Sequence, residues 1–184
     1  PSNVLTNSPP PPPLSGLTFE AESGAITPPF YINGTVVQQD LLTGSVDGGR
    51  ASYQFTVTNA GIYTVSVMVN APSGESDSLF VSVNMEPTDA NIWDIPVTNG
   101  IEERTVQWRD VPGLKFTLPA AQHTLIVRGR EAGVQIDRIT VKLLTVTPPT
   151  PIPGRPPAPT QLRTSEVAPR RRDIGWTSEL TATT

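Results

Sequence analysis

Short segments in which apolar and polar residues alternate recur along the middle of this chain. The segments 53–57, 63–69 and 79–83 each have an apolar residue at every second position. This alternation is typical of β-strands with one buried face, because successive side chains of a strand point to opposite faces. No segment carries a helical period of useful length, and prolines and glycines interrupt the chain at short intervals. The sequence therefore predicts an all-β fold, namely a jelly-roll β-sandwich.

Further short strands are expected on both sides of these segments, at residues 17–22, 92–97, 104–108, 114–118, 124–128 and 134–143. The last segment has a change of phase. Val134 and Ile136 set one apolar alternation, whereas Ile139 and Val141 set the other. A β-bulge near Asp137 would account for this slip, since a bulge inserts one extra residue into a strand.

Two proline-rich segments flank the predicted strands. Residues 1–16 include an unbroken proline run, and residues 147–159 are also rich in proline. Such segments favour extended polyproline II and cannot bury a core. We expect two linkers around one folded domain at residues 17–146, and a short tail at 160–184. The chain reads as a piece of a longer, multidomain protein that is secreted or held at the cell surface.

Charge and cysteine content exclude several classes of function. The 184 residues carry 13 Lys and Arg against 17 Asp and Glu, a net charge of −4, so a nucleic-acid partner is not expected. No apolar run is long enough to span a membrane. There are no cysteines, which excludes thiolate catalysis, zinc–thiolate sites and disulfides. His123 is the single histidine and is interpreted as a turn residue.

Three carboxylates suggest a site for a hard cation. Glu20 and Glu22 stand two residues apart, so on a strand both would point to one face. Asp137 lies at the predicted bulge. Ca²⁺ prefers oxygen ligands of this kind. The alternatives are an exposed strand face or, less well supported, a pair of glycosidase carboxylates, which would have to flank a cleft.

Several motifs resemble those of carbohydrate-binding modules of the family 6 and family 35 type, which have a galactose-binding-domain-like fold. Phe19-Glu20-Ala21-Glu22 resembles the opening Glu-x-Glu strand, and Ala60-Gly61-Ile62-Tyr63 resembles a later strand of that family. The other similar stretches are 48–55, 71–81, 92–94, 106–108, 118–125, 128–131 and 133–139. Beyond the second linker, residues 158–163 and 174–177 resemble the start of a fibronectin type III domain, but the tail is too short to complete one.

The resemblance implies a non-catalytic, monomeric module that is stabilised by one structural Ca²⁺ and binds a polysaccharide or oligosaccharide for a partner domain. By position, Glu20, Glu22 and Asp137 would be side-chain ligands of the metal. A backbone carbonyl near Arg50 would be another ligand. The alternative is a structural spacer or protein-interaction module without a sugar site. Ile101 favours the spacer, because many sugar-binding members of the family have Trp at that point.

Candidate sugar-binding residues combine aromatic rings with polar neighbours. Trp93 and Trp108 are the first candidates, although either could instead belong to the core. Tyr31 is a third aromatic candidate, on a predicted loop. The charged candidates are Asp77, Asp94, Arg128, Arg130 and Glu131. A structural ion pair of Arg130 with Asp77 or Glu131 is the alternative interpretation of the charged group.

Overall fold

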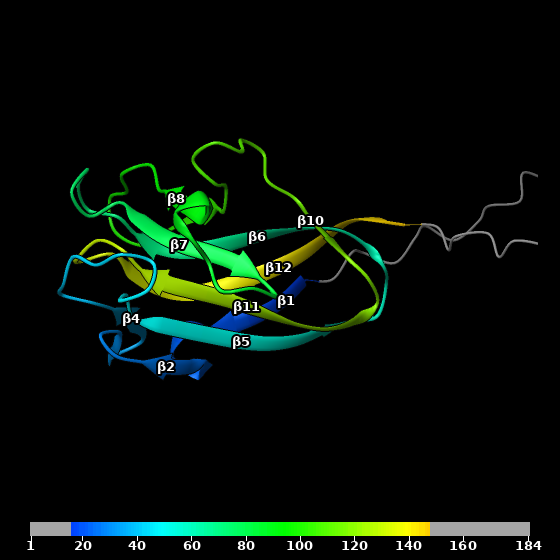
Figure 1. Ribbon diagram of the computed structural model, residues 1–184, viewed down its shortest axis with the longest axis horizontal. Coiled ribbons are helices and arrows are strands. Elements are labelled where there is room, and N and C mark those ends of the chain that lie inside the picture. The colour runs from blue at the N-terminus through cyan, green and yellow to red at the C-terminus, as the bar shows by residue number, and fades with distance from the viewer. Residues whose placement is uncertain (1–15, 148–184) are drawn as a thin grey trace, which may run out of the picture. The chain divides into compact units, whose positions relative to one another are not determined.

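Residues 16–147 are described by a computed structural model, in which strands from two antiparallel sheets face each other (Figure 1). The strands of the first sheet are β1 (Gly16–Glu20), β3 (Tyr31–Asn33), β4 (Val36–Gln38), β6 (Gly61–Asn70), β9 (Glu102–Thr105), β10 (Phe116–Leu118) and β12 (Gln135–Val146). Those of the second are β2 (Ala25–Thr27), β5 (Arg50–Val57), β7 (Ser78–Val83), β8 (Ile92–Asp94) and β11 (Ala121–Gly129). The predicted β-sandwich is confirmed.

The first sheet has seven strands, and its central path runs β10-β6-β12-β4-β3. β1 also pairs with β12, and β9 pairs with β6. The second sheet has five strands in the order β2-β5-β11-β7-β8. β1 and the end of β12 are paired, so residues 16 and 147 both lie at one end of the sandwich. The opposite end carries the loops that follow β1, β6 and β11 (Figure 1).

The core lies between the two sheets and follows the alternation seen in the sequence. Along β6, every second residue from Gly61 to Val69 is buried. Side chains of the second sheet face them from β5 and β11, and include Phe55 and Leu125. Ile139 lies beside the β6 residues, on the neighbouring strand β12 of the same sheet. Burial of apolar surface at ~25 cal/mol per Å² is the main force that holds such sheets together.

The register of β12 against β6 shifts between Ile136 and Arg138, which confirms the predicted bulge at Asp137. Other details differ from expectation. β1 ends at Glu20, and Glu22 lies in a short 3-10 helix, η1 (Ala21–Ser23), so the two carboxylates do not share one strand. A second 3-10 helix, η2 (Asp89–Asn91), precedes β8.

The segment between β1 and β5 was not expected to contain strands, yet it forms β2, β3 and β4. Tyr31 therefore stands on strand β3 and not on a loop. These strands have three residues each, too few for a recognisable alternation. Tertiary pairing with β5 and β12 makes them strands.

Within the described residues, no helix is long and apolar enough to cross a membrane. The expected linkers and the fibronectin-like tail lie almost entirely outside the described residues, in 1–15 and 148–184.

Candidate functional site

The expected calcium ligands come from three elements that meet near the start of β12. Glu20 ends β1 and is paired in register with Arg138. Helix η1, which holds Glu22, lies against β12 and β4. Asp137 occupies the bulge of β12. The fold thus brings the two terminal strands and η1 to one corner of the sandwich.

The chemistry at this corner fits a cation in one respect. Oε2 of Glu22 is buried and has no hydrogen-bond partner within the described residues. A buried carboxylate oxygen without a donor is costly, and a cation would satisfy it. Burial and then the Glu22 charge raise the pKa of Tyr53, so that phenol stays neutral and donates to the carbonyl of Ala21 at 2.7 Å.

Side chains alone do not complete such a site. Residues 16–147 contain no cluster of three or more Asp, Glu, His or Cys side chains that could hold a metal ion. Backbone carbonyls or waters would have to supply much of the coordination, as Ca²⁺ permits. The side chain of Arg50 takes no part in this corner, because its Nε donates to Glu86 at 2.8 Å.

The predicted charged group is assembled at the loop end of the sandwich as ion pairs. Arg130 lies 2.5 Å from Glu131, which is the ion pair that the sequence left open. The other oxygen of Glu131 accepts the backbone N–H of Asp77 at 2.8 Å. Asp94 is held by Arg109 through two hydrogen bonds of 2.7 and 2.8 Å. Arg109 was not predicted, although its position after Trp108 marked it as a polar neighbour.

These contacts shift the pKa values of the carboxyl groups. Burial and the neighbouring Glu131 charge raise the pKa of Asp77. Burial also acts to raise the pKa of Glu131, but hydrogen bonds from Asp77 and Ser78 and the charge of Arg130 outweigh it, so that pKa is lowered. Arg109 lowers the pKa of Asp94. Arg130, Glu131 and Asp94 therefore use most of their hydrogen bonds on partners inside the protein and have few left for a ligand.

The two candidate tryptophans both contact the core. Trp93 is 0% exposed and belongs to the core, so its ring cannot stack on a sugar from solvent. Trp108 packs against the core, with its ring edge-on to Phe116 and its Nε1–H donated to the carbonyl of Val81 at 2.7 Å. The core interpretation that the sequence left open holds for Trp93, whereas Trp108 is half-buried at the edge of the core.

Arg128 anchors a loop and is not free for a ligand. Its Nη2 donates to the carbonyls of Val46 and Gly48 at 2.5 and 2.8 Å, and its Nη1 lies 3.5 Å from Glu86. The guanidinium thereby ties the loop before β5 to the end of β11. This role follows from the register of β11 beside β5, which places Arg128 opposite Arg50.

Tyr31 is the most exposed aromatic residue among those described, with 39% of its surface accessible. It begins a row of polar side chains that crosses the first sheet: Tyr31, Gln38, Gln135 and Asn70, on β3, β4, β12 and β6. The row points away from the core, since the adjacent residues Val37, Ile136 and Val69 are buried between the sheets.

Sequence reasoning missed Gln38, Gln135 and Asn70. Each stands next to a buried apolar residue at the end of a strand, and this position was the only indication in the sequence that its side chain faces outward. The register that aligns the three residues depends on how the strands pair, which the sequence does not reveal. An aromatic ring beside amide groups can pack on the C–H face of a sugar while the amides bind its hydroxyls.

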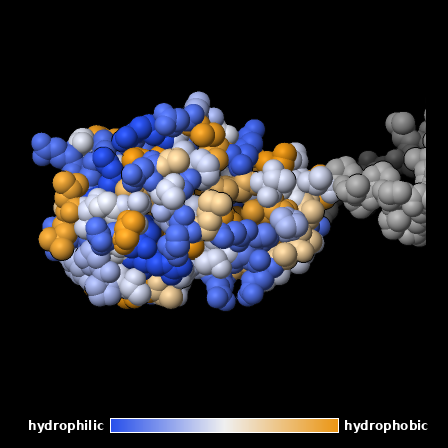
Figure 2. Space-filling model, in the orientation of Figure 1, coloured by the Kyte–Doolittle hydropathy of each residue, from blue (hydrophilic) through white to orange (hydrophobic). Residues whose placement is uncertain are grey.

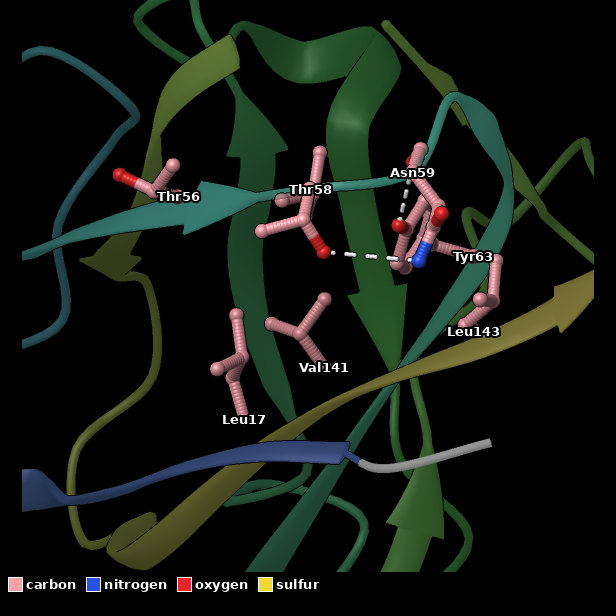
Figure 3. A pocket seen from close by; sticks show the side chains of 8 residues that line it. Leu17, Thr56, Thr58, Asn59, Tyr63, Val141 and Leu143 are labelled. Carbon is pink, nitrogen blue, oxygen red and sulfur yellow. Dashed lines mark hydrogen bonds between the residues drawn. The ribbon is translucent and has the colours of Figure 1, made fainter. Parts of the chain in front are cut away.

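A hollow of about 140 Å³ opens at the other end of the sandwich, near the start of β1 (Figure 3). Its lining residues are Leu17, Thr56, Val57, Thr58, Asn59, Tyr63, Val141 and Leu143. Tyr63 donates its hydroxyl to the carbonyl of Asn59 at 2.7 Å. None of the predicted site residues lines this hollow. The face drawn in Figure 2 is mostly hydrophilic, with apolar residues in small separate groups.

The described strands define a class of protein fold, the jelly-roll sandwich of the family 6 and family 35 carbohydrate-binding modules. The chain is similar to a β-(1,4)-mannanase from Podospora anserina that carries a family 35 module, with 18% identity and a TM-score of 0.54. That match covers 73% of this chain and 29% of the mannanase. No protein-family model and no curated protein matches the sequence.

Two further solved structures are similar. One is an exo-β-1,3-galactanase from Phanerochaete chrysosporium, determined with galactose, at 21% identity and a TM-score of 0.52, covering 69% of this chain and 29% of that one. The other is the C-terminal family 6 module of a laminarinase from Zobellia galactanivorans, at 16% identity and a TM-score of 0.51. Here the match covers 70% of this chain and 99% of the module. This chain thus spans under a third of the two enzymes and nearly all of the module.

Proposed function

We propose that this chain is a non-catalytic module that binds polysaccharide through the surface around Tyr31. The observation that carries the proposal is the exposed Tyr31 ring beside the row of amides on the first sheet. The ring offers an apolar face to sugar C–H groups, and the half-buried amides of Gln135 and Asn70 offer hydrogen bonds. Gln38 is buried and connects these amides to Tyr31. The charged group around Arg130 is a weaker candidate, because its members already pair with one another.

Similar structures support this assignment by analogy of fold. Their names concern a mannanase, a galactanase and a laminarinase, so neutral β-linked polysaccharides are the first ligands to test. In the two enzymes the similarity covers only part of the chain, as expected if an accessory module were matched. We infer that the module holds a partner domain near polysaccharide outside the cell, and that multivalency raises a weak affinity.

A structural spacer without a sugar site is the second candidate function. It is favoured by the burial of Trp93 and the packing of Trp108, which remove two of the expected aromatic contacts. The self-paired state of Arg130 and Glu131 points the same way. The two functions differ in one measurable property, which is retardation of the protein by a polysaccharide.

We further propose that Ca²⁺ stabilises the corner formed by β1, η1 and β12. Within residues 16–147, Oε2 of Glu22 is buried and has no hydrogen-bond partner, which supports this proposal. Glu20 and Asp137 would be additional side-chain ligands, and backbone carbonyls near Arg50 would complete the coordination. The metal would supply charge compensation and would link the first strand to the last.

Affinity electrophoresis in gels that contain galactomannan, β-1,3-galactan or laminarin tests the proposed function. We expect the wild-type protein to be retarded by at least one of them. Tyr31→Ala should fold normally and lose affinity about fivefold or more, because an aromatic contact is worth about 1 kcal/mol. Val111→Ala, at another exposed apolar position, is the control and should bind as the wild type does. Retardation of Tyr31→Ala equal to that of the wild type would reject this surface, and no retardation of the wild type would favour the spacer.

A further inference from the structure

The polar row on the first sheet is one continuous chain of hydrogen bonds. Asn70 Nδ2 donates to Gln135 Oε1 at 3.0 Å, and Gln135 Nε2 donates to Gln38 Oε1 at 2.8 Å. Gln38 Nε2 donates to the Tyr31 hydroxyl at 2.5 Å, and that hydroxyl donates to Asp40 Oδ2 at 2.8 Å. The polar groups of four strands therefore point their donors in one direction, towards Asp40. We call this chain the amide relay.

The terminal carboxylate determines this direction. An ionised carboxylate can only accept hydrogen bonds, so the Tyr31 hydroxyl must use its single proton on Asp40. The hydroxyl oxygen then accepts from Gln38, which places the nitrogen of that amide towards β3 and its oxygen towards β12. The same constraint passes to Gln135 and to Asn70, because each amide has one oxygen and one NH₂ group. Charge-assisted hydrogen bonds are the stronger kind, so Asp40 is able to impose this order.

The order determines where the remaining N–H donors of the row lie. Each amide in the relay donates one of its two N–H groups along the row, and its oxygen accepts from the neighbour or, for Asn70, from Thr98 at 3.2 Å. Since Asn70 and Gln135 are partly exposed, their second N–H groups are the free donors of the row among the described residues. The exposed carboxylate of Asp40 lies at the opposite end, beside the Tyr31 ring.

We propose that Asp40 is a specificity-determining residue of the saccharide surface, and this inference rests on the proposed function. It positions the amides so that they offer N–H donors to the oxygens of a sugar, and it places a negative charge at the edge of the same surface. An uncharged polysaccharide satisfies both features, because its hydroxyl groups accept from the amides and also donate to the carboxylate. A polyuronate is disfavoured, because its carboxylates would face Asp40 without a compensating charge from the relay.

The test compares Asp40→Asn with Asp47→Asn, the same substitution at another exposed position of the segment between β4 and β5. Binding is measured by affinity electrophoresis with galactomannan, β-1,3-galactan and laminarin as neutral probes and polygalacturonate as the acidic probe. We expect the wild type to be retarded by a neutral probe and not by polygalacturonate. Asp40→Asn should weaken neutral binding at least fivefold, because an asparagine amide can donate and so no longer imposes the direction. Asp47→Asn should bind as the wild type does.

A second measurement separates positioning from a direct contact. In NMR spectra without ligand, Asp40→Asn and Tyr31→Phe should each shift the side-chain NH₂ signals of Gln38, Gln135 and Asn70, and Asp47→Asn should not. Weaker binding without these shifts would overturn the positioning role. Unchanged neutral binding in Asp40→Asn, or wild-type retardation by polygalacturonate, would overturn the specificity role while the proposed function stands. If no probe retards the wild type, the proposed function fails and this inference fails with it.

Discussion

Asp77 and Glu131 are two neighbouring carboxyl groups with opposite pKa shifts. Glu131 receives the backbone N–H of Asp77 and the guanidinium of Arg130, so it holds the negative charge of the pair. Burial together with the Glu131 charge raises the pKa of Asp77, and the opposing charge of Arg130 does not outweigh them. The ionised form of Asp77 is therefore a source of instability in the folded protein at neutral pH.

Replacement of Asp77 by Asn should therefore stabilise the protein at pH 7. The pKa of this carboxyl group is higher in the folded state than in the unfolded state. The free energy of unfolding therefore falls as the pH rises from the ordinary pKa, near 4, through the raised pKa. Above that window the penalty is complete, and Asp77→Asn removes it. Urea denaturation at pH 7 and at pH 3 measures the gain, which should be present at pH 7 and absent at pH 3.

Glu75→Gln is the matched control for this substitution. It removes one negative charge from the same loop, at an exposed position, and should leave the pH dependence close to that of the wild type. A gain of equal size in Glu75→Gln would show that net charge matters and that the contact with Glu131 does not.

At the scale of the element, the segment between β4 and β5 is held by polar contacts and not by an apolar core. Buried Gln39 donates to Leu41 O and Thr43 Oγ1 at 2.5 and 3.0 Å and accepts the N–H of Gly49 at 3.0 Å. Close backbone approach completes the arrangement, since a Cβ on Gly48 would lie 1.9 Å from the carbonyl oxygen of Gly129. The segment is thereby anchored to the end of β11, where the N–H of Gly129 also donates to the carbonyl of Gly49 at 2.9 Å.

Gly48→Ala should destabilise the protein by about 1–3 kcal/mol or more, because the added methyl group meets backbone atoms that cannot rotate away. Gly44 stands in the same segment, and a Cβ there meets nothing within 4 Å. Gly44→Ala should therefore be close to neutral. Urea denaturation of both variants measures the difference. Equal stability of the two variants would contradict the close approach of Gly48 to β11.

At the scale of the whole molecule, the proposed calcium site would connect the first strand of the sandwich to the last. β1 is paired with β12 at the edge where η1 and the bulge meet. With no cysteine in the chain, no disulfide stabilises this corner. A metal at this corner would oppose separation of β1 from the sheet.

Chelation should therefore lower the melting temperature. A ligand at 100 times its Kd adds about 2.7 kcal/mol to stability, which corresponds to several degrees for a domain of this size. Calorimetry with Ca²⁺ and with a chelator measures the change, and calcium titration gives the affinity. Glu22→Gln should abolish the response to chelator, whereas Glu103→Gln, at an exposed position on β9, should retain it. A melting temperature that does not respond to chelator in the wild type would reject the site.

Much of the fold could be predicted from the sequence, because alternation is a local property. The long strands β5, β6 and β12 have a clear period of two, and even the bulge at Asp137 was visible as a change of phase. The short strands β2, β3 and β4 were missed, because three residues carry no measurable period. Pairing with longer strands stabilises them, and that pairing is not local.

The sequence by itself determined which side chains face the core along the long strands, and which carboxylates were available for a cation. Only the tertiary structure decided that Trp93 is fully buried, and that Tyr31, Gln38, Gln135 and Asn70 form one row. The physical reason is that alternation specifies the face of a strand on which a residue lies, but not the neighbouring strand or its register. A saccharide surface made from four strands depends on both.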